Sequence, residues 1–366
     1  MSKWKKVKLG DVCSLYQPKT IPTKELKDDM PYYVYGANGI IGKYHSYNHI
    51  DSEIAIACRG ATCGTVNITL PKSWITGNAM VAHIESNELS FKYLFYALSN
   101  ANMKNVITGA AQPQITRSNL KDLEIPLPAM EEQKEIAARL DAVSDLLAKQ
   151  KQLLSEQDTL IQSLFYDIFG DPIKNNKGWK IEKLGKVCDV RDGTHDSPSF
   201  IEKGYPLVTS KNLSEGMVSF KNVSYISKED YDKINIRSKV DTGDLLMPMI
   251  GTIGNPVIVL GDASFAIKNV ALIKFNKKDV LNIYIKYILS SEYFKKISSE
   301  EKRGGTQKFM SLGSIRGMKI PVPPLELQEK FAAIVEQIES EKSKIKSAIA
   351  ETQTLFNALM SEYFEE

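Results

Sequence analysis

The sequence predicts an α+β fold, with two α/β domains in an internal pseudo-twofold repeat separated by a long antiparallel two-helix coiled coil. The main observation is the repeat itself. WKKVKLGDVC from Trp4 returns as WKIEKLGKVC from Trp179, and LKDLEIPLPAMEEQKEIAARL from Leu120 returns as IRGMKIPVPPLELQEKFAAIV from Ile315. In both copies a Pro-rich phrase opens a long helical stretch. Because this unit is far longer than a solenoid repeat, it indicates duplicated modules, each a domain followed by a helix.

Each predicted domain mixes strand and helix patterns. In the first, EIAIACRG and MVAHIES alternate like strands and FKYLFYALSN has helical spacing. In the second, DLLMPMIGTIGNPVIVL reads as a strand, a glycine turn and a strand. The repeat therefore divides the chain into a first α/β domain (1–128), a central long helix (129–169), a second α/β domain (170–323) and a C-terminal long helix (324–366).

Both helical stretches carry apolar residues in steps of three and four, which is the heptad pattern of a coiled coil. Gly170 and Pro172 end the first stretch. Each seam needs a partner, which could be its own domain, a second copy of the chain, or the other helix in antiparallel orientation. We favour the last pairing because the chain returns after the second domain, and polar seam residues such as Gln150 and Thr352 can set its register. The predicted pairing residues are Ile136, Leu140, Val143, Leu147, Leu154 and Ile161 with Phe331, Ile334, Ile338, Ile345, Leu355 and Leu359.

Bulk composition is that of an ordinary globular protein, with 43% hydrophobic and 25% charged residues among 366. No apolar run approaches the roughly 20 residues of a membrane span, and the N-terminus lacks the apolar stretch of a secretory signal, so we expect a soluble cytoplasmic protein. The net charge of +3 permits nucleic-acid binding without demanding it. Four cysteines in a chain of this length do not form a disulfide framework.

The order of these parts, including the junction LFYDIFGDPIKNNKGWKIEKLGKVC from Leu164 to Cys188, resembles the specificity subunit (HsdS) of type I restriction–modification systems. The resemblance covers essentially the whole chain, and it rests on the order and duplication of motifs that are individually short. It implies two target-recognition domains that each read one half of a bipartite DNA site. It also implies that two methyltransferase subunits dock on the helices, which set the spacer, and that restriction subunits join through them.

On this resemblance the chain itself catalyses nothing, and S-adenosylmethionine, ATP and Mg²⁺ belong to the partner subunits. Reading base edges requires amides, guanidiniums and hydroxyls on loops held by a rigid scaffold. Scaffold phrases match between the copies, as in RGATCG from Arg59 and MIGTIG from Met249, whereas the loops differ. The candidate DNA contacts are Tyr35, Asn38, Lys43, His45, Arg59, Thr62, Asn78, Gln112 and Gln114 in the first domain, and Arg191, Thr194, His195, Lys211, Asn269, Gln307 and Lys308 in the second.

Other interpretations have weaker support in the sequence. His45, His49, Cys58 and Cys63 have acceptable spacing for zinc, but local packing explains them better, so no metal is expected. ANGIIGKY from Ala37 resembles a phosphate loop without its hydroxyl and its leading strand. A nucleophile elbow and a methyltransferase motif are absent from the sequence. Two rival functions stay open: a coiled-coil adaptor with two protein-binding heads, and a self-sufficient nucleotide-modifying enzyme.

Overall fold

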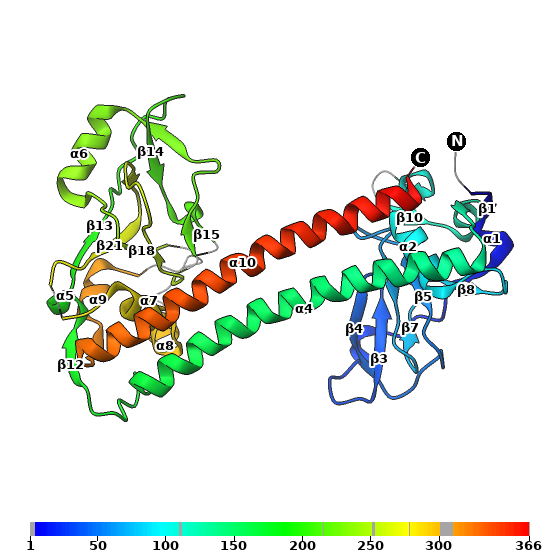
Figure 1. Cartoon of the computed structure of the whole chain (residues 1–366), viewed down its shortest axis with the longest axis horizontal. Helices are drawn as coiled ribbons and strands as arrows, with labels where there is room; N and C mark the ends of the chain where they lie inside the picture. Colours follow the sequence, from blue (N-terminus) through cyan, green and yellow to red (C-terminus); the bar gives the residue numbers. More distant parts are fainter. Residues whose placement is uncertain are drawn as a thin grey trace. The chain divides into compact units, whose positions relative to one another are not determined.

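The computed structural model describes residues 4–109, 112–214, 216–250, 253–277, 279–300 and 310–365. The chain folds into two compact units: unit 1 comprises Met1–Gln152 and Lys346–Glu366, and unit 2 comprises Leu153–Ile345. Each unit contains one β-rich domain and one half of each of two long helices (Figure 1). The α+β class and the duplication predicted from the sequence are both confirmed.

Unit 1 is built on a four-stranded antiparallel sheet with the strand order β2-β8-β5-β6 and a three-stranded sheet with the order β4-β3-β7. Apolar side chains of the first sheet, among them Leu15, Ile54 and Met80, pack against α2 in one core. The elements are β1 (Lys6–Lys8), α1 (Leu9–Val12), β2 (Cys13–Tyr16), β3 (Tyr32–Gly36), β4 (Gly39–Tyr44), β5 (Ile54–Ala57), β6 (Val66–Ile68), β7 (Trp74–Ile75), β8 (Ala79–Ile84), α2 (Phe91–Asn100), β9 (Ile107–Thr108), β10 (Gln114–Ile115), α3 (Arg117–Leu120) and β11 (Glu124–Pro126).

Unit 2 repeats this plan. Its four-stranded sheet has the order β13-β21-β18-β19 and its three-stranded sheet the order β17-β14-β20, with one parallel pair in the same place as in unit 1. The elements are β12 (Lys180–Lys183), α5 (Leu184–Val187), β13 (Asp189–Asp192), β14 (Tyr205–Val208), β15 (Leu213–Ser214), β16 (Met217–Val218), β17 (Ser224–Ile226), α6 (Lys228–Ser238), β18 (Leu245–Pro248), β19 (Val257–Ile258), β20 (Ala266–Ile267), β21 (Val270–Lys274), α7 (Asn282–Ser290), α8 (Glu292–Glu300), α9 (Leu312–Gly317) and β22 (Lys319–Val322).

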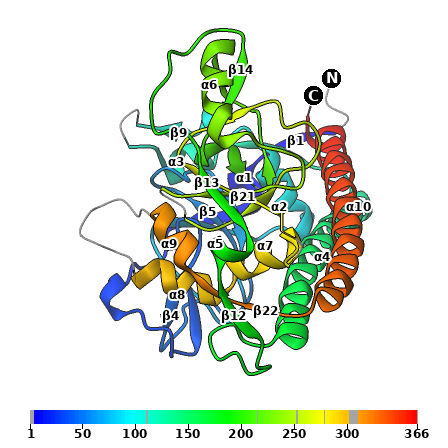
Figure 2. The same cartoon turned by 90° about the vertical axis from the view of Figure 1, so that its left-hand side faces the viewer.

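The long helices α4 (Met130–Phe169) and α10 (Leu325–Phe364) have 40 residues each, which corresponds to about 60 Å. In unit 1 the Arg139 guanidinium donates to the Tyr363 hydroxyl at 3.1 Å, and the Gln150 amide donates to the Thr352 hydroxyl at 3.2 Å. Residue numbers rise along α4 in the direction in which they fall along α10, so the two helices run antiparallel. In unit 2 the Lys342 ammonium donates to Asp158 at 2.6 Å in the same sense, with the two helices side by side (Figure 2).

The phase of the predicted seam on α10 needs a correction. Leu355 is 50% exposed and Ile334 38% exposed, whereas the next residues along the chain, Phe356 and Val335, pack into the cores of unit 1 and unit 2. The steps after Phe331 are therefore four and then three, not three and then four. The other predicted seam residues are buried (Ile136, Leu140, Leu147, Ile161, Phe331 and Ile338) or partly buried (Val143, Leu154, Ile345 and Leu359).

A fully buried glutamine joins each domain to the start of its long helix. Gln133 accepts from the Ser90 N–H at 2.8 Å and donates to the Glu88 and Pro128 carbonyls at 2.7 and 2.9 Å. Gln328 repeats this arrangement in unit 2: it accepts from Leu281 N–H at 2.9 Å and donates to the carbonyls of Asp279 and Pro323 at 3.1 and 2.9 Å. Because each side chain pairs a helix N-terminus and two loop carbonyls, it holds the domain against the helix without leaving buried polar groups unpaired.

Among the described residues, no helix combines the length and the apolar character needed to cross a membrane.

Candidate nucleic-acid interface

Three segments of unit 1 meet at the turn that follows β5. The Cys58 N–H donates to the Asn78 carbonyl and the Ile115 N–H to the Cys58 carbonyl, both at 3.0 Å, and Gly60 N–H donates to the Pro113 carbonyl at 3.1 Å. Gly64, with φ of +93°, lets the chain turn tightly against Met103, which a Cβ would approach to 3.0 Å. The junction is thus a rigid backbone platform that presents the side chains around it.

The side chains at this junction are exposed and rich in hydrogen-bonding groups. Arg59 pairs with Gln114 in an isolated β-bridge, and both side chains are exposed, as is Asn78. Gln112 is also exposed, and Thr62 is half-buried in the turn. A guanidinium next to carboxamides offers the donors and acceptors that read guanine and adenine edges.

Unit 2 builds the same junction with other side chains. Met249 N–H donates to the Asn269 carbonyl at 3.4 Å, and Met310 N–H donates to the Met249 carbonyl at 2.9 Å. Met249 is therefore the counterpart of Cys58 rather than Arg59, which corrects the sequence alignment: the turn in unit 1 is one residue longer. The candidates Gln307 and Lys308 lie outside the described residues.

The loop after β13 is organised around the buried carboxylate of Asp192. The His195 ring stands between Asn269 and Asp192, with Nδ1 2.8 Å from the Asn269 Oδ1 and Nε2 3.0 Å from the Asp192 Oδ2. Arg237 donates to the other oxygen of Asp192. The hydrogen bond to Asn269, and then that to Asp192, raises the pKa of His195. His195 is exposed, but both of its ring nitrogens are engaged within unit 2, so an acceptor on DNA could pair with the imidazole only in exchange for Asn269 or Asp192.

Two candidates near Asp192, Arg191 in β13 and Thr194 in the loop after it, are engaged within unit 2. The Arg191 guanidinium donates to the Asp189 carboxylate at 3.0 and 2.7 Å and to the Arg237 carbonyl at 3.1 Å. The Thr194 hydroxyl accepts from Asp196 N–H at 3.1 Å. These contacts hold the two side chains in place, and both residues stay candidate DNA contacts. Lys211, in contrast, is exposed in the 3-10 turn Ser210–Asn212.

The remaining candidates of unit 1 lie on the β3–β4 hairpin. Tyr35 is only 5% exposed, and its hydroxyl accepts from Leu70 N–H at 3.0 Å, so it belongs to the core and the prediction that it contacts DNA is wrong. Asn38 is exposed in the turn, and the Lys43 ammonium lies 5.2 Å from the centre of the Tyr33 ring. The exposed ring of His45 lies against the Tyr44 ring, at 4.0 Å between centroids.

The segments of the two alternative motifs have the following structures. ANGIIGKY forms a hairpin, with Tyr35 opposite Ile40 and Gly36 opposite Gly39, not a phosphate loop that leads into a helix. Among the described residues no group of three or more His, Cys, Asp or Glu side chains could hold a metal ion. His49 instead pairs with Tyr16 at 3.0 Å, and burial raises the pKa of the Cys58 thiol.

Comparison with known proteins defines the class. The family model described as "Type I restriction modification DNA specificity domain" matches residues 1–156 and again residues 176–352, once for each copy of the repeat. The chain therefore belongs to the family of type I restriction–modification specificity subunits, as its sequence suggested. A member of this family supplies the DNA specificity of the restriction–modification system and is itself non-catalytic.

Particular relatives span nearly the whole chain. It is 24% identical to the MjaVIII specificity subunit of Methanocaldococcus jannaschii over 92% of this chain and 86% of that one. It is 21% identical to the EcoKI specificity subunit of Escherichia coli K12 over 90% of this chain and 72% of that one. The crystal structure of the type I S subunit from M. genitalium has the same fold, with a TM-score of 0.66 and 16% identity over 100% of this chain and 97% of that one.

Proposed function

We propose that each β-rich domain of this specificity subunit reads one half of a bipartite DNA site. The observation that carries the proposal is the repeated junction, at which the same backbone hydrogen bonds support different side chains. In unit 1 Cys58 and Ile115 join segments that present Arg59 and Gln114, whereas in unit 2 the corresponding junction at Met249 adjoins His195. Two domains with the same backbone scaffold and different loops are suited to reading two different DNA sequences.

The side chains proposed to contact DNA follow from their exposure and chemistry. In unit 1 Arg59 would pair with a guanine edge, and Asn78, Gln112 and Gln114 with adenine edges, each good bidentate pair contributing about 1–3 kcal/mol of discrimination. Thr62 and the hairpin residues Asn38, Lys43 and His45 are further candidates. In unit 2 we propose His195, Asn269 and Lys211, with Gln307 and Lys308 carried over from the sequence.

We further propose that two methyltransferase subunits dock on α4 and α10. Leucines recur at every seventh residue of α4, at Leu146, Leu153 and Leu160, and each of these side chains is exposed. The seven-residue period keeps them on one face of the helix, beside the seam that packs on α10. On α10, Ile334 and Leu355 are exposed as well. Such apolar stripes favour a protein partner over solvent.

The partners would bring the chemistry of the complex. In this proposal S-adenosylmethionine binds the methyltransferase subunits, and restriction subunits that join the complex use ATP and Mg²⁺. The lengths of α4 and α10 would set the spacer between the two half-sites, since the pair connects the two domains along the chain.

Domain exchange tests the central proposal. Residues 1–128 are replaced with the first domain of another family member, and methylated sites are mapped in a host that carries the complete system. We expect one half of the recognition sequence to change and the other half and the spacer to stay the same. The matched exchange of residues 170–323 should change the opposite half. A change in both halves, or in neither, would refute the assignment of one domain to one half-site.

A further inference from the structure

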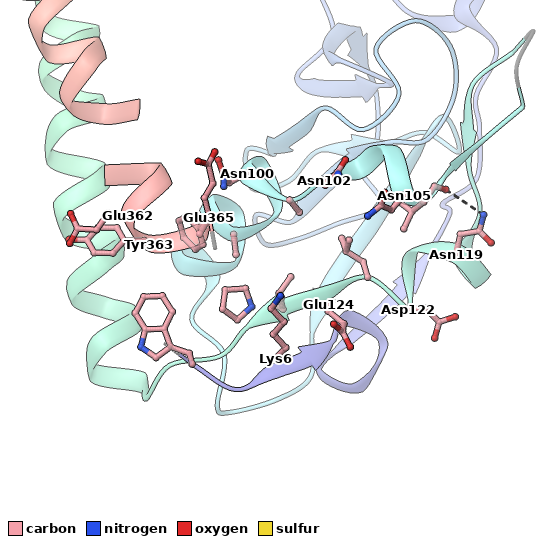
Figure 3. A pocket seen from close by; sticks show the side chains of 18 residues that line it. Lys6, Asn100, Asn102, Asn105, Asn119, Asp122, Glu124, Glu362, Tyr363 and Glu365 are labelled. Atoms are coloured by element: carbon pink, nitrogen blue, oxygen red, sulfur yellow. Dashed lines mark hydrogen bonds between the residues drawn. The ribbon is translucent and has the colours of Figure 1, made fainter. Parts of the chain in front are cut away.

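Unit 1 contains a groove that neither the seam nor the DNA candidates account for. It has a volume of about 860 Å³ and lies between β11, the chain after α2 and the last turn of α10 (Figure 3). The amides of Asn100, Asn102 and Asn105 line one side. The carboxylates that line it are Asp122, Glu124, Glu362 and Glu365, with Lys6 as the lining cation.

In unit 2 a tyrosine crosses the corresponding place. Met103 and Phe294 are equivalent, because a Cβ on Gly64 would meet Met103 at 3.0 Å and one on Gly254 would meet Phe294 at 3.4 Å. The residue before each is Asn102 in unit 1 and Tyr293 in unit 2. The Tyr293 hydroxyl donates to the Lys319 carbonyl, and burial raises the pKa of Tyr293.

The acceptor of that hydrogen bond also has a counterpart in the groove. Lys319 pairs with Lys183 in the β12–β22 ladder, and Glu124 pairs with Lys8 at the same position of the β1–β11 ladder. The carbonyl of Glu124 thus takes the place of the Lys319 carbonyl. Because Asn102 is too short to reach it, the space that an aromatic ring fills in unit 2 is open in unit 1.

The charge of the groove indicates which charged side chains its occupant carries besides an aromatic ring. Four carboxylates and one ammonium line it, and although one of the carboxylates, Asp122, is paired with Lys8 at 2.9 Å, carboxylates still prevail. The C-terminal end of α10 adds the negative end of a helix dipole. This balance repels a DNA phosphate and attracts lysine or arginine. The groove also reaches the last turn of α10, where Glu362 lies one heptad after Leu355 and so on the helix face proposed to dock methyltransferase subunits.

We propose that the groove of unit 1 binds a segment of one methyltransferase subunit that carries an aromatic residue next to lysine or arginine. The aromatic ring takes the place that Tyr293 occupies in unit 2, and a tyrosine hydroxyl would donate to the Glu124 carbonyl. Since unit 2 fills its own site, the two methyltransferase subunits dock unequally. This inference rests on the proposed docking of methyltransferase subunits on the helices.

Native mass spectrometry tests the inference when the full chain is titrated with its methyltransferase subunit. In N102Y the new phenol fills the groove from within, and we expect the affinity for one of the two copies to fall about 30-fold, as for loss of an aromatic anchor. The affinity for the other copy should not change. The matched control is Y293F, which keeps the ring in unit 2 and should leave both affinities unchanged.

A second variant keeps the test decisive if the phenol at position 102 disturbs the fold. E362K reverses an exposed charge at the rim and should weaken the same copy, the more so at low salt. A photoreactive residue at position 105 should crosslink to the methyltransferase subunit.

The inference is overturned if both variants bind both copies as the wild type does, or if both affinities fall equally. A crosslink only to a restriction subunit, to a second copy or within the chain would also overturn it. If the wild-type chain bound no methyltransferase subunit at all, the proposed docking would fail together with the inference.

Discussion

The replacement of Gln133 by leucine measures how strongly the first domain is held to α4. The change keeps the approximate size of the side chain but removes three hydrogen bonds, to Ser90 N–H and to the carbonyls of Glu88 and Pro128. Each buried group left unpaired costs about 1–3 kcal/mol. Burial of the added apolar surface returns about 1.5–3 kcal/mol. The three unpaired groups together cost about 3–9 kcal/mol, so after the apolar gain we expect the free energy of unfolding of unit 1 to fall by about 4 kcal/mol, the middle of the range that these figures give.

Hydrogen exchange resolved by mass spectrometry can assign this loss to one unit, because local opening energies differ across a structure. Peptides that cover the start of α2 should exchange faster in Q133L, and peptides that cover the start of α7 should not. Q328L should show the opposite pattern. Q162L makes the same change at an exposed position of α4 and should leave both units unaltered. A loss below about 1 kcal/mol in Q133L, or equal acceleration in both units, would refute the role assigned to the glutamines.

Three further outcomes follow from the structure. Because the folded state raises the pKa of His195 above its ordinary value, its stabilising effect is complete below about pH 6.5 and is lost as the pH rises through the raised pKa; the difference in unfolding free energy between wild type and H195Q should therefore shrink with rising pH, and a constant difference would contradict this. Lys342, 10% exposed, pairs with Asp158 and Glu339, whose side chains are 65% and 40% exposed, so the carboxylates left in K342M are hydrated and the thermal midpoint should be unchanged or higher; a lower midpoint would argue against this. One heptad added to each long helix lengthens the pair by about 10 Å, and methylation mapping should show a spacer longer by one to about three base pairs, since DNA rises about 3.4 Å per pair; an active variant with an unchanged spacer would mean that the helices do not set it.

The sequence was sufficient to predict the class of fold, the duplication and the family, because each depends on patterns repeated over many residues. It was not sufficient to predict the phase of the α10 seam. Ile334 and Val335 are both apolar and both lie between Phe331 and Ile338, so a heptad count accepts either. The choice between the two residues depends on which side of α10 faces α4 and the domain. Val335 lies on that side, in the core of unit 2.

The candidate site was predicted less completely, because exposure depends on contacts far apart in the chain. Tyr35 looked like a loop residue, but its side chain is only 5% exposed and packs with Ile75 and Val81 in a core cluster. The roles of Gln133 and Gln328 were missed as well. The repeat did contain a signal, because both glutamines occupy the same place in EEQKEIA and ELQEKFA. However, a polar residue near the start of a helix is usually exposed to solvent.

The contacts of these two glutamines bear on how new specificities can arise. All six of their hydrogen bonds are to main-chain atoms, in unit 1 and in unit 2 alike. Any sequence that adopts the same turn presents the same main-chain N–H and carbonyl groups. The attachment of a domain to its helix therefore depends little on the side chains of that domain. Recombination between genes of this family could therefore exchange one domain for a diverged one while its helix stays the same, and if each domain reads one half-site, as proposed, a cell would acquire a new target sequence in a single event.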